Sequence, residues 1–168
     1  TVKKGLEPAL IESLVVPDNL DIKFVHERIR QAVYITIPEE EKNLVHLQTG
    51  RLLLKSLSKE KLENKVFDVV HQFNFGKDLI TDKSEIKQLI ELNLHAGLKA
   101  KSASAFLPAN NYLYNAKNLL NEDAWQTNYK LALKIYEETA EICYLTGKYE
   151  ETRKIADIII KNSTDILD

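Results

Sequence analysis

Apolar residues recur at every third or fourth position along most of the chain, which is the spacing of one buried face of an α-helix. The first clear stripe begins at Val25 and runs to about Ile35. Further helices are predicted over about 38–57, 59–74 and 83–98, from Leu107–Pro108 onward, and as a last pair joined at 146–148. The pattern predicts an all-α fold of about seven or eight helices, packed as antiparallel pairs.

The ends of these stripes carry residues that fit helix termini. Pro38 suits a first helical position, where its missing N–H needs no partner, and three glutamates follow it at the positive helix end. Ser58 is the predicted N-cap of the next helix, and Gly76 is expected to end that helix. Asp82-x-x-Glu85 resembles a capping box, in which each side chain bonds the backbone N–H of the other residue.

Before residue 25 the pattern changes. Apolar residues between Leu6 and Leu14 predict one short helix, and two extended runs follow it at 14–16 and 22–25. The segment 17–19 between the runs reads Pro-Asp-Asn, which is typical of a turn because proline fixes φ and Asp and Asn bond back to the backbone. Helix, hairpin and helix in this order predict the C-terminal part of a winged-helix unit. We therefore expect two domains, a winged-helix remnant over 1–37 and a helical repeat domain over 38–168.

The last eighty or so residues contain an internal repeat with an offset of 43 positions. The shared positions are small residues at 97/140 and 100/143 and aromatic residues at 106/149. Ser104 stands where the second copy has the turn glycine Gly147. Small residues, a turn and an aromatic residue in this order resemble a tetratricopeptide repeat. Because helix pairs bury their faces only by stacking, the preceding helices are expected to extend the stack.

The composition of the chain excludes several classes of protein. The 168 residues are 44% apolar and 29% charged, with a formal net charge of −2, which is typical of a folded domain. No apolar run is long enough to span a membrane, and no basic block indicates a nucleic-acid or membrane-surface partner. One cysteine cannot form an internal disulfide, and we expect a cytoplasmic protein. The absence of methionine suggests a fragment of a longer chain.

Candidate catalytic and metal-binding groups are sparse. The sequence has no glycine-rich phosphate loop, no nucleophile elbow and no zinc-protease motif. Asp68 with His71, and Glu91 with His95, each put a carboxylate and a histidine on one helix face, but a metal site needs more converging ligands. We therefore expect ordinary surface or core histidines, no metal and no enzyme activity. Cys143, at a small-residue position of the repeat, is expected to be a buried, unreactive thiol.

His26 allows three interpretations. His26-Glu27-Arg28 resembles the phospho-accepting box of sensor kinases, but the proline of that box is missing here. A histidine that opens the helix after a hairpin also resembles the one in the winged-helix domain of STAND-class ATPases, which contacts bound ADP. The third interpretation is a histidine that only caps or packs at the helix start.

Several blocks of the chain are similar to one family of large multidomain signalling proteins. The blocks are 24–54, 67–76, 92–101 and 125–147, in the family's order, and the resemblance extends over about 14–162. Members combine a Ser/Thr-kinase-like domain, a STAND-type ATPase, a helical repeat region, a GAF domain and a sensor histidine kinase. They are bacterial, with similar arrangements in fungal hybrid kinases. Val33, Phe73 and Phe75 depart from the usual residues, which affects packing only.

The resemblance implies a non-catalytic segment that couples the ATPase switch to the downstream kinase. It implies no cofactor in this segment, ATP or ADP in the parent's ATPase domain, and the ATPase, GAF and histidine kinase domains as intramolecular partners. It also makes His26 the candidate nucleotide-sensing residue of the parent. The alternative function is a tetratricopeptide-like scaffold that binds a separate protein or peptide.

In tetratricopeptide-like folds the first helix of each pair lines the concave face. By the repeat alignment, the partner-binding candidates are Glu91, Leu98, Lys101, Lys134, Glu137, Glu141 and Tyr144. Their mixed charge with a single aromatic ring suits a polar intramolecular contact better than an apolar ligand pocket.

Overall fold

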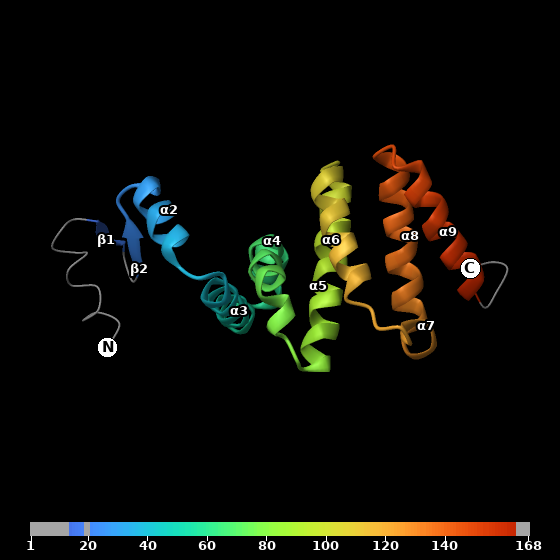
Figure 1. Ribbon diagram of the computed structural model, residues 1–168, viewed down its shortest axis with the longest axis horizontal. Helices are drawn as coiled ribbons and strands as arrows, with labels where there is room; N and C mark the ends of the chain where they lie inside the picture. Colours follow the sequence, from blue (N-terminus) through green and yellow to red (C-terminus); the bar gives the residue numbers. More distant parts are fainter. Residues whose placement is uncertain (1–13, 19–20, 164–168) are drawn as a thin grey trace. The chain divides into compact units, whose positions relative to one another are not determined.

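Figure 1 shows the fold of the computed structural model, which describes residues 14–18 and 21–163. Most of this part of the chain is helical, so the predicted all-α class is confirmed. The short helix expected over 6–14 falls almost entirely outside the described residues. The chain divides into two compact units, residues 1–42 and 43–168. The expected domain boundary between residues 37 and 38 stays a prediction.

The first unit contains a two-stranded antiparallel hairpin followed by a helix. Strand β1 (Val15–Asp18) pairs with β2 (Asp21–Phe24), and Val15 stands opposite Phe24. The Val25 N–H extends the pairing by donating to the Leu14 carbonyl at 3.1 Å. Helix α2 (Glu27–Thr36) follows. The predicted hairpin and the helix after it are thus present, although Pro17 and Asp18, expected in the turn, belong to β1. The winged-helix assignment stays a prediction.

Helix α3 (Glu39–Ser56) begins in the first unit and belongs to the second from residue 43 onward. The elements that follow are α4 (Lys59–Gly76), the short 3₁₀ turn η1 (Lys77–Leu79), α5 (Lys83–Ser102), α6 (Phe106–Asn118), the short α7 (Ala124–Thr127), α8 (Tyr129–Leu145) and α9 (Tyr149–Asn162). Helices α5 and α6 pack as one pair and α8 and α9 as another, with α6 against α8 between them (Figure 1). The tetratricopeptide-like character of this stack stays a prediction.

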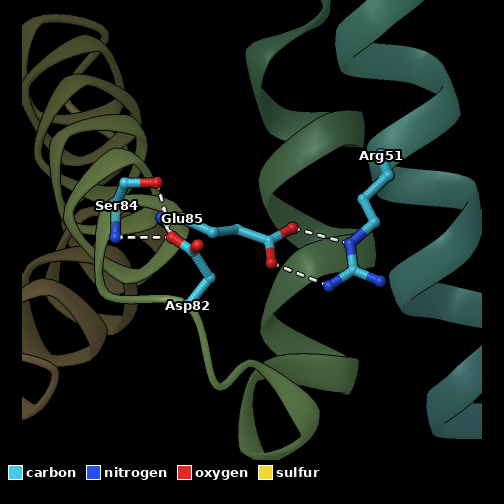
Figure 2. A network of polar contacts seen from close by, with 4 residues as sticks. All are labelled: Arg51, Asp82, Ser84 and Glu85. Carbon is cyan, nitrogen blue, oxygen red and sulfur yellow. Dashed lines mark hydrogen bonds and ion pairs between the residues drawn. The ribbon is translucent and has the colours of Figure 1, made fainter.

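The predicted helix caps form, with one change of partner. Ser58 Oγ accepts a hydrogen bond from the Lys61 N–H, and Asp82 Oδ1 accepts from the N–H groups of Ser84 and Glu85 at 2.7 and 2.9 Å. Glu85 does not reach back to residue 82 as a capping box would have it. Figure 2 shows its carboxylate paired instead with the Arg51 guanidinium through two hydrogen bonds of 2.7 Å. This bidentate pair ties α3 to α5.

The internal repeat is visible in the hydrogen bonds of two turns. The Ala105 N–H donates to the Ala100 carbonyl at 2.9 Å, and 43 residues later the Lys148 N–H donates to the Cys143 carbonyl at 2.8 Å. Both bonds close the end of a helix, as in a Schellman motif. The helices after these turns, α6 and α9, also begin 43 residues apart. The predicted offset is therefore confirmed at the backbone.

Glycines allow the helices to approach closely. A Cβ added at Gly97 on α5 would lie 2.7 Å from Cγ of the fully buried Leu113 on α6. A Cβ at Gly76 would lie 2.6 Å from the Asn43 carbonyl oxygen and from Leu47 Cβ on α3. Gly76 ends α4 as expected, but its φ of −101° is open to other residues, so close contact with α3 is what requires glycine there.

One buried amide pair joins α4 to α5. Asn93 is fully buried, and its side-chain amide N–H group donates to the Asn74 side-chain oxygen at 2.9 Å. Asn74 donates in return to the Asn93 side-chain oxygen, also at 2.9 Å. Asn93 donates a further hydrogen bond to the Leu89 carbonyl at 3.0 Å. The buried amide is thus well supplied with partners, as burial of a polar group requires.

Candidate functional site

Four charged side chains meet between α5 and α8. Glu138, only 5% exposed, accepts from Lys101 through one carboxylate oxygen and from Lys134 through the other, at 2.9 Å from Lys134. Lys101 also donates to Glu141 at 2.8 Å. We call Lys101, Lys134, Glu138 and Glu141 the α5–α8 charge network. Because it joins helices of two successive pairs, it links the two copies of the repeat.

The network holds Glu138, Lys101 and Lys134 in their charged forms. Burial alone would raise the pKa of Glu138, but hydrogen bonds from Lys101 and Lys134 keep this pKa below its ordinary value. Burial alone would lower the pKa of Lys101, but its bonds to Glu138 and Glu141 raise this pKa. The bond to Glu138 also raises the pKa of Lys134. The site is therefore a network of ion pairs in which Glu138 is negative and Lys101 and Lys134 are positive.

Three of the seven predicted partner-binding residues, Lys101, Lys134 and Glu141, come together in this network. The other four do not join it. Glu91 and Glu137 are exposed, Leu98 is half-buried, and Tyr144 stacks edge-on with Tyr149 at a ring distance of 5.7 Å. Whether any of the seven binds a partner stays a prediction.

Glu138, the buried centre of the network, was missed from the sequence. Its position four residues after Lys134 on a predicted helix is the signal that could have found it, because residues at this spacing are neighbours on a helix surface. The bond from Lys101 on α5 had no such local signal, since 37 residues separate the two positions.

His26 lies where the sequence placed it, between the hairpin and α2. Its backbone is extended, with φ −130° and ψ 136°, and its carbonyl accepts from the N–H groups of Ile29 and Arg30. Its side chain makes no capping hydrogen bond to α2 and is exposed. His26 thus occupies the N-cap position of α2 without a side-chain cap. Its interpretations as a nucleotide sensor, a phospho-acceptor or a packing residue stay predictions.

The histidines of the two carboxylate–histidine spacings noted in the sequence make other contacts in the structure. His95 Nε2 pairs with Glu63 on α4 at 2.8 Å rather than with Glu91 on its own helix. His71 meets Phe75 edge-on, with ring centres 4.9 Å apart. Across residues 14–18 and 21–163, no group of three or more histidine, cysteine, aspartate or glutamate side chains is arranged to hold a metal ion.

Cys143 on α8 is fully buried, as expected from its small-residue position. Its thiol donates to the Asn110 side-chain oxygen at 3.8 Å and lies 3.6 Å from the Tyr114 hydroxyl on α6. Burial and the bonds to Cys143 and Glu151 raise the pKa of Tyr114. The thiol thus belongs to the packing between α6 and α8.

Within the described residues, no helix combines the length and the hydropathy that crossing a membrane requires.

The sequence of the chain is similar to that of a known protein over most of its length. It is similar to a protein of Dictyostelium discoideum named hybrid signal transduction histidine kinase G. The two are 32% identical over 158 aligned positions, which cover 80% of this chain. The chain spans only 5% of the length of that relative. No protein-family model matches the chain, and no solved structure matches it.

Proposed function

We propose that this chain is a non-catalytic signal-transmission segment of a multidomain histidine kinase, which couples an ATPase switch to kinase output in the cytoplasm. The observation that supports the proposal is the similarity to the Dictyostelium kinase, which covers most of this chain and a small share of the relative. A segment of this kind contributes packing surfaces rather than a reaction. ATP or ADP would bind in the ATPase domain of the parent protein and not here.

The described architecture supports a rigid transmitting element. Helix α3 is joined to α5 by the Arg51–Glu85 pair, and α5 is joined to α8 by the α5–α8 charge network. Together these contacts cross from the start of the second unit to its last helix pair. A displacement of α3 would then be passed along the stack as a whole, because packed helices move as bodies rather than deform continuously.

Removal of the matching segment from the Dictyostelium kinase tests this role. Its deletion should abolish the regulation of histidine autophosphorylation while leaving the kinase domain folded. Replacement by this chain should restore the regulation. A replacement carrying Glu138→Lys, which breaks the α5–α8 charge network, should restore less than one carrying Glu122→Lys, at an exposed position just before α7. Unchanged autophosphorylation after deletion would contradict the proposal.

His26 is proposed as the residue that senses nucleotide in such a parent. An exposed histidine at a helix start can donate a ring N–H to a phosphate oxygen, and the positive helix end favours that anion. His26→Ala in a parent protein should lower ADP affinity and raise basal output. The control is His95→Ala, a histidine on α5 that pairs with Glu63. Equal ADP affinity for the two variants and the wild type would end the sensor proposal.

The absence of catalysis is tested directly on the purified chain. We expect it to show a helical circular-dichroism spectrum and neither to bind nor to hydrolyse ATP. Isothermal titration calorimetry measures the binding, and phosphate release measures the hydrolysis. ATP turnover that survives further purification would show that the segment has a reaction of its own.

A further inference from the structure

The pair α5–α6 is covered on one side by α8, the first helix of the next pair (Figure 1). Ile90 of α5, Ala116 of α6 and Ile135 of α8 form one buried cluster at this contact. Ile90 is 6% exposed, and the other two side chains are fully buried. One apolar side chain of the following helix thus packs in one cluster with a residue from each helix of the pair before it.

The offset of 43 residues assigns a counterpart in α8–α9 to each residue of α5–α6 at this contact. Leu133 on α8 is the counterpart of Ile90, and Ile159 on α9 is the counterpart of Ala116. Both counterparts are apolar, and both are only half-buried. Helix α9 is the last helix of the described part of the chain, so within that part no following helix covers them. The second pair therefore exposes part of the apolar surface that the first pair buries.

Ile160 extends this apolar surface, since it is 74% exposed. Its counterpart in the first pair is Lys117, whose ammonium group lies 4.7 Å from the centre of the Tyr114 ring. The Tyr114 hydroxyl in turn lies 3.6 Å from the Cys143 sulfur on α8. The position of Ile160 thus belongs to the side of the second helix that, in the first pair, faces the next pair.

One charged position of the first pair is aromatic in the second. Lys101 on α5 crosses to α8, where it pairs with Glu138 and Glu141. Its counterpart 43 residues later is Tyr144, which is 61% exposed. A tyrosine does not neutralise a buried carboxylate as Lys101 does, and an unpaired buried charge is costly. A helix packed on this position is therefore expected to carry an apolar residue where α8 carries Glu138.

Single exposed apolar residues are common on protein surfaces and need no partner. Leu133, Tyr144, Ile159 and Ile160, which we call the α8–α9 outer face, differ from such residues. Each is the counterpart of a residue on the side of α5–α6 that faces α8. Helix pairs of a repeat bury their faces by stacking on the next pair. By the repeat, the contact that α8 makes with α5–α6 continues onto this face.

We infer that the α8–α9 outer face packs against the first helix of a third helix pair of the same repeat. This helix places one apolar side chain, in the position of Ile135, against Leu133 and Ile159. It places a second apolar side chain, in the position of Glu138, against Tyr144. The new contact is thus apolar where the contact between the first two pairs is ionic. The inference rests on the proposed function only in that a longer parent protein supplies the third pair.

A tandem chain tests the inference without the parent protein. Residues 121–163, which carry α7, α8 and α9, are inserted a second time after Ser163, so the offset of 43 is kept. The inserted copy carries Glu138→Leu. Urea denaturation followed by circular dichroism should give one transition, with a midpoint about 1 M above that of the 168-residue chain. Because no kinase is present, failure of this test is distinguishable from failure of the signal-transmission role.

Ile160→Asp in the original copy distinguishes a buried contact from ordinary surface. In the 168-residue chain it should leave the urea midpoint unchanged, because Ile160 is exposed there. In the tandem chain it should remove most of the gain in midpoint. The control is Leu107→Asp on α6, where the leucine is 70% exposed. This control should leave the gain intact.

A second tandem chain keeps the native Glu138 in the inserted copy. Its midpoint should rise less than that of the leucine version, because the inserted carboxylate meets Tyr144 and not a lysine. Tyr144→Lys in the original copy should restore the gain, since it recreates the pair that Lys101 forms with Glu138. Added salt should reduce the gain of this ionic version more than the gain of the leucine version.

Three results would overturn the inference. The first is a tandem chain whose midpoint equals that of the 168-residue chain, or whose insert unfolds in a separate transition. The second is an equal effect of Ile160→Asp on both chains. The third is self-association of the 168-residue chain in analytical ultracentrifugation that Ile160→Asp abolishes, because the occupant would then be a second copy. Where the tandem chain aggregates, the insert is shortened to residues 121–145, which adds α7 and α8 alone, and the same outcomes apply.

Discussion

Ser104 adopts the left-handed backbone conformation that Gly147 adopts 43 residues later. Their φ angles are 58° and 75°. Each residue follows the last turn of a first helix, α5 or α8, and the turn hydrogen bonds match between the copies. A serine in this region carries a steric cost that glycine avoids. The first copy of the repeat therefore keeps the turn geometry although it lacks the turn glycine.

Substitutions at these two positions should change the free energy of unfolding in opposite directions. Ser104→Gly should raise the free energy of unfolding by about 0.5 kcal/mol, since relief of strain exceeds the added freedom of the unfolded chain. Gly147→Ala should lower it by about 1 kcal/mol through the backbone alone, because a Cβ there meets no atom within 4 Å. Urea denaturation measures both. A destabilised Ser104→Gly would show that the serine side chain contributes more than its backbone costs.

Gly97→Ala should destabilise the α5–α6 pair by about 1–3 kcal/mol, the usual range for overpacking a tight core. The added methyl would lie 2.7 Å from Cγ of Leu113, which is fully buried. In the background Leu113→Ala the same substitution should cost much less. A double-mutant cycle on unfolding free energies gives the coupling. Costs that simply add would mean that the clash is relieved elsewhere.

Glu138→Gln should lower the free energy of unfolding at pH 7 by about 1–3 kcal/mol, because it removes charged hydrogen bonds from a buried site. The pKa of Glu138 is depressed in the folded protein, so its contribution is complete above the unfolded-state value of about 4.3. The contribution is lost as the pH falls through the lower folded-state pKa. The difference in unfolding free energy between wild type and variant should therefore narrow as the pH falls below about 5.

Glu137→Gln is the matched control for this pH series. Glu137 is the exposed neighbour of Glu138 on α8, so its substitution should have an effect within about 0.5 kcal/mol at every pH. If stability depends on pH in the same way for the two variants, the α5–α8 charge network does not cause the loss of stability at low pH.

The Arg51–Glu85 pair should show a modest coupling energy of about 0.5–1 kcal/mol, because the Arg51 side chain is 47% exposed. The cycle uses Arg51→Ala, Glu85→Ala and both together. Arg51→Lys should recover only part of the coupling, since an ammonium cannot form the two parallel bonds. Added salt should weaken what remains. A coupling that salt does not change would point to packing rather than charge.

Local features of the chain were predictable from its sequence. Ser58 and Asp82 cap helices as expected, and the offset of 43 residues holds in the turns at Ser104 and Gly147. These features depend on residues within one turn of each other, or on a pattern that repeats along the chain. Such signals can be recognised in a sequence without knowledge of the tertiary structure.

Contacts between distant helices were not predictable in the same way. Glu85 pairs with Arg51, which is 34 residues away in the sequence, and not with the start of its own helix. His95 pairs with Glu63 on α4 and not with Glu91 on its own helix. Glu138 was predictable in part, because its bond to Lys134 is local and its bond to Lys101 is not.

The Asn74–Asn93 pair limits how the helices can move. Sliding α4 along α5 by one turn, about 5.4 Å, would separate the two amides and leave the fully buried Asn93 amide without its partner on α4. An unsatisfied buried amide costs about 1–3 kcal/mol, so the pair favours one register of α4 along α5. Motion that reaches this stack is therefore expected to carry α4 and α5 together, because sliding or separating the two helices would break the amide pair.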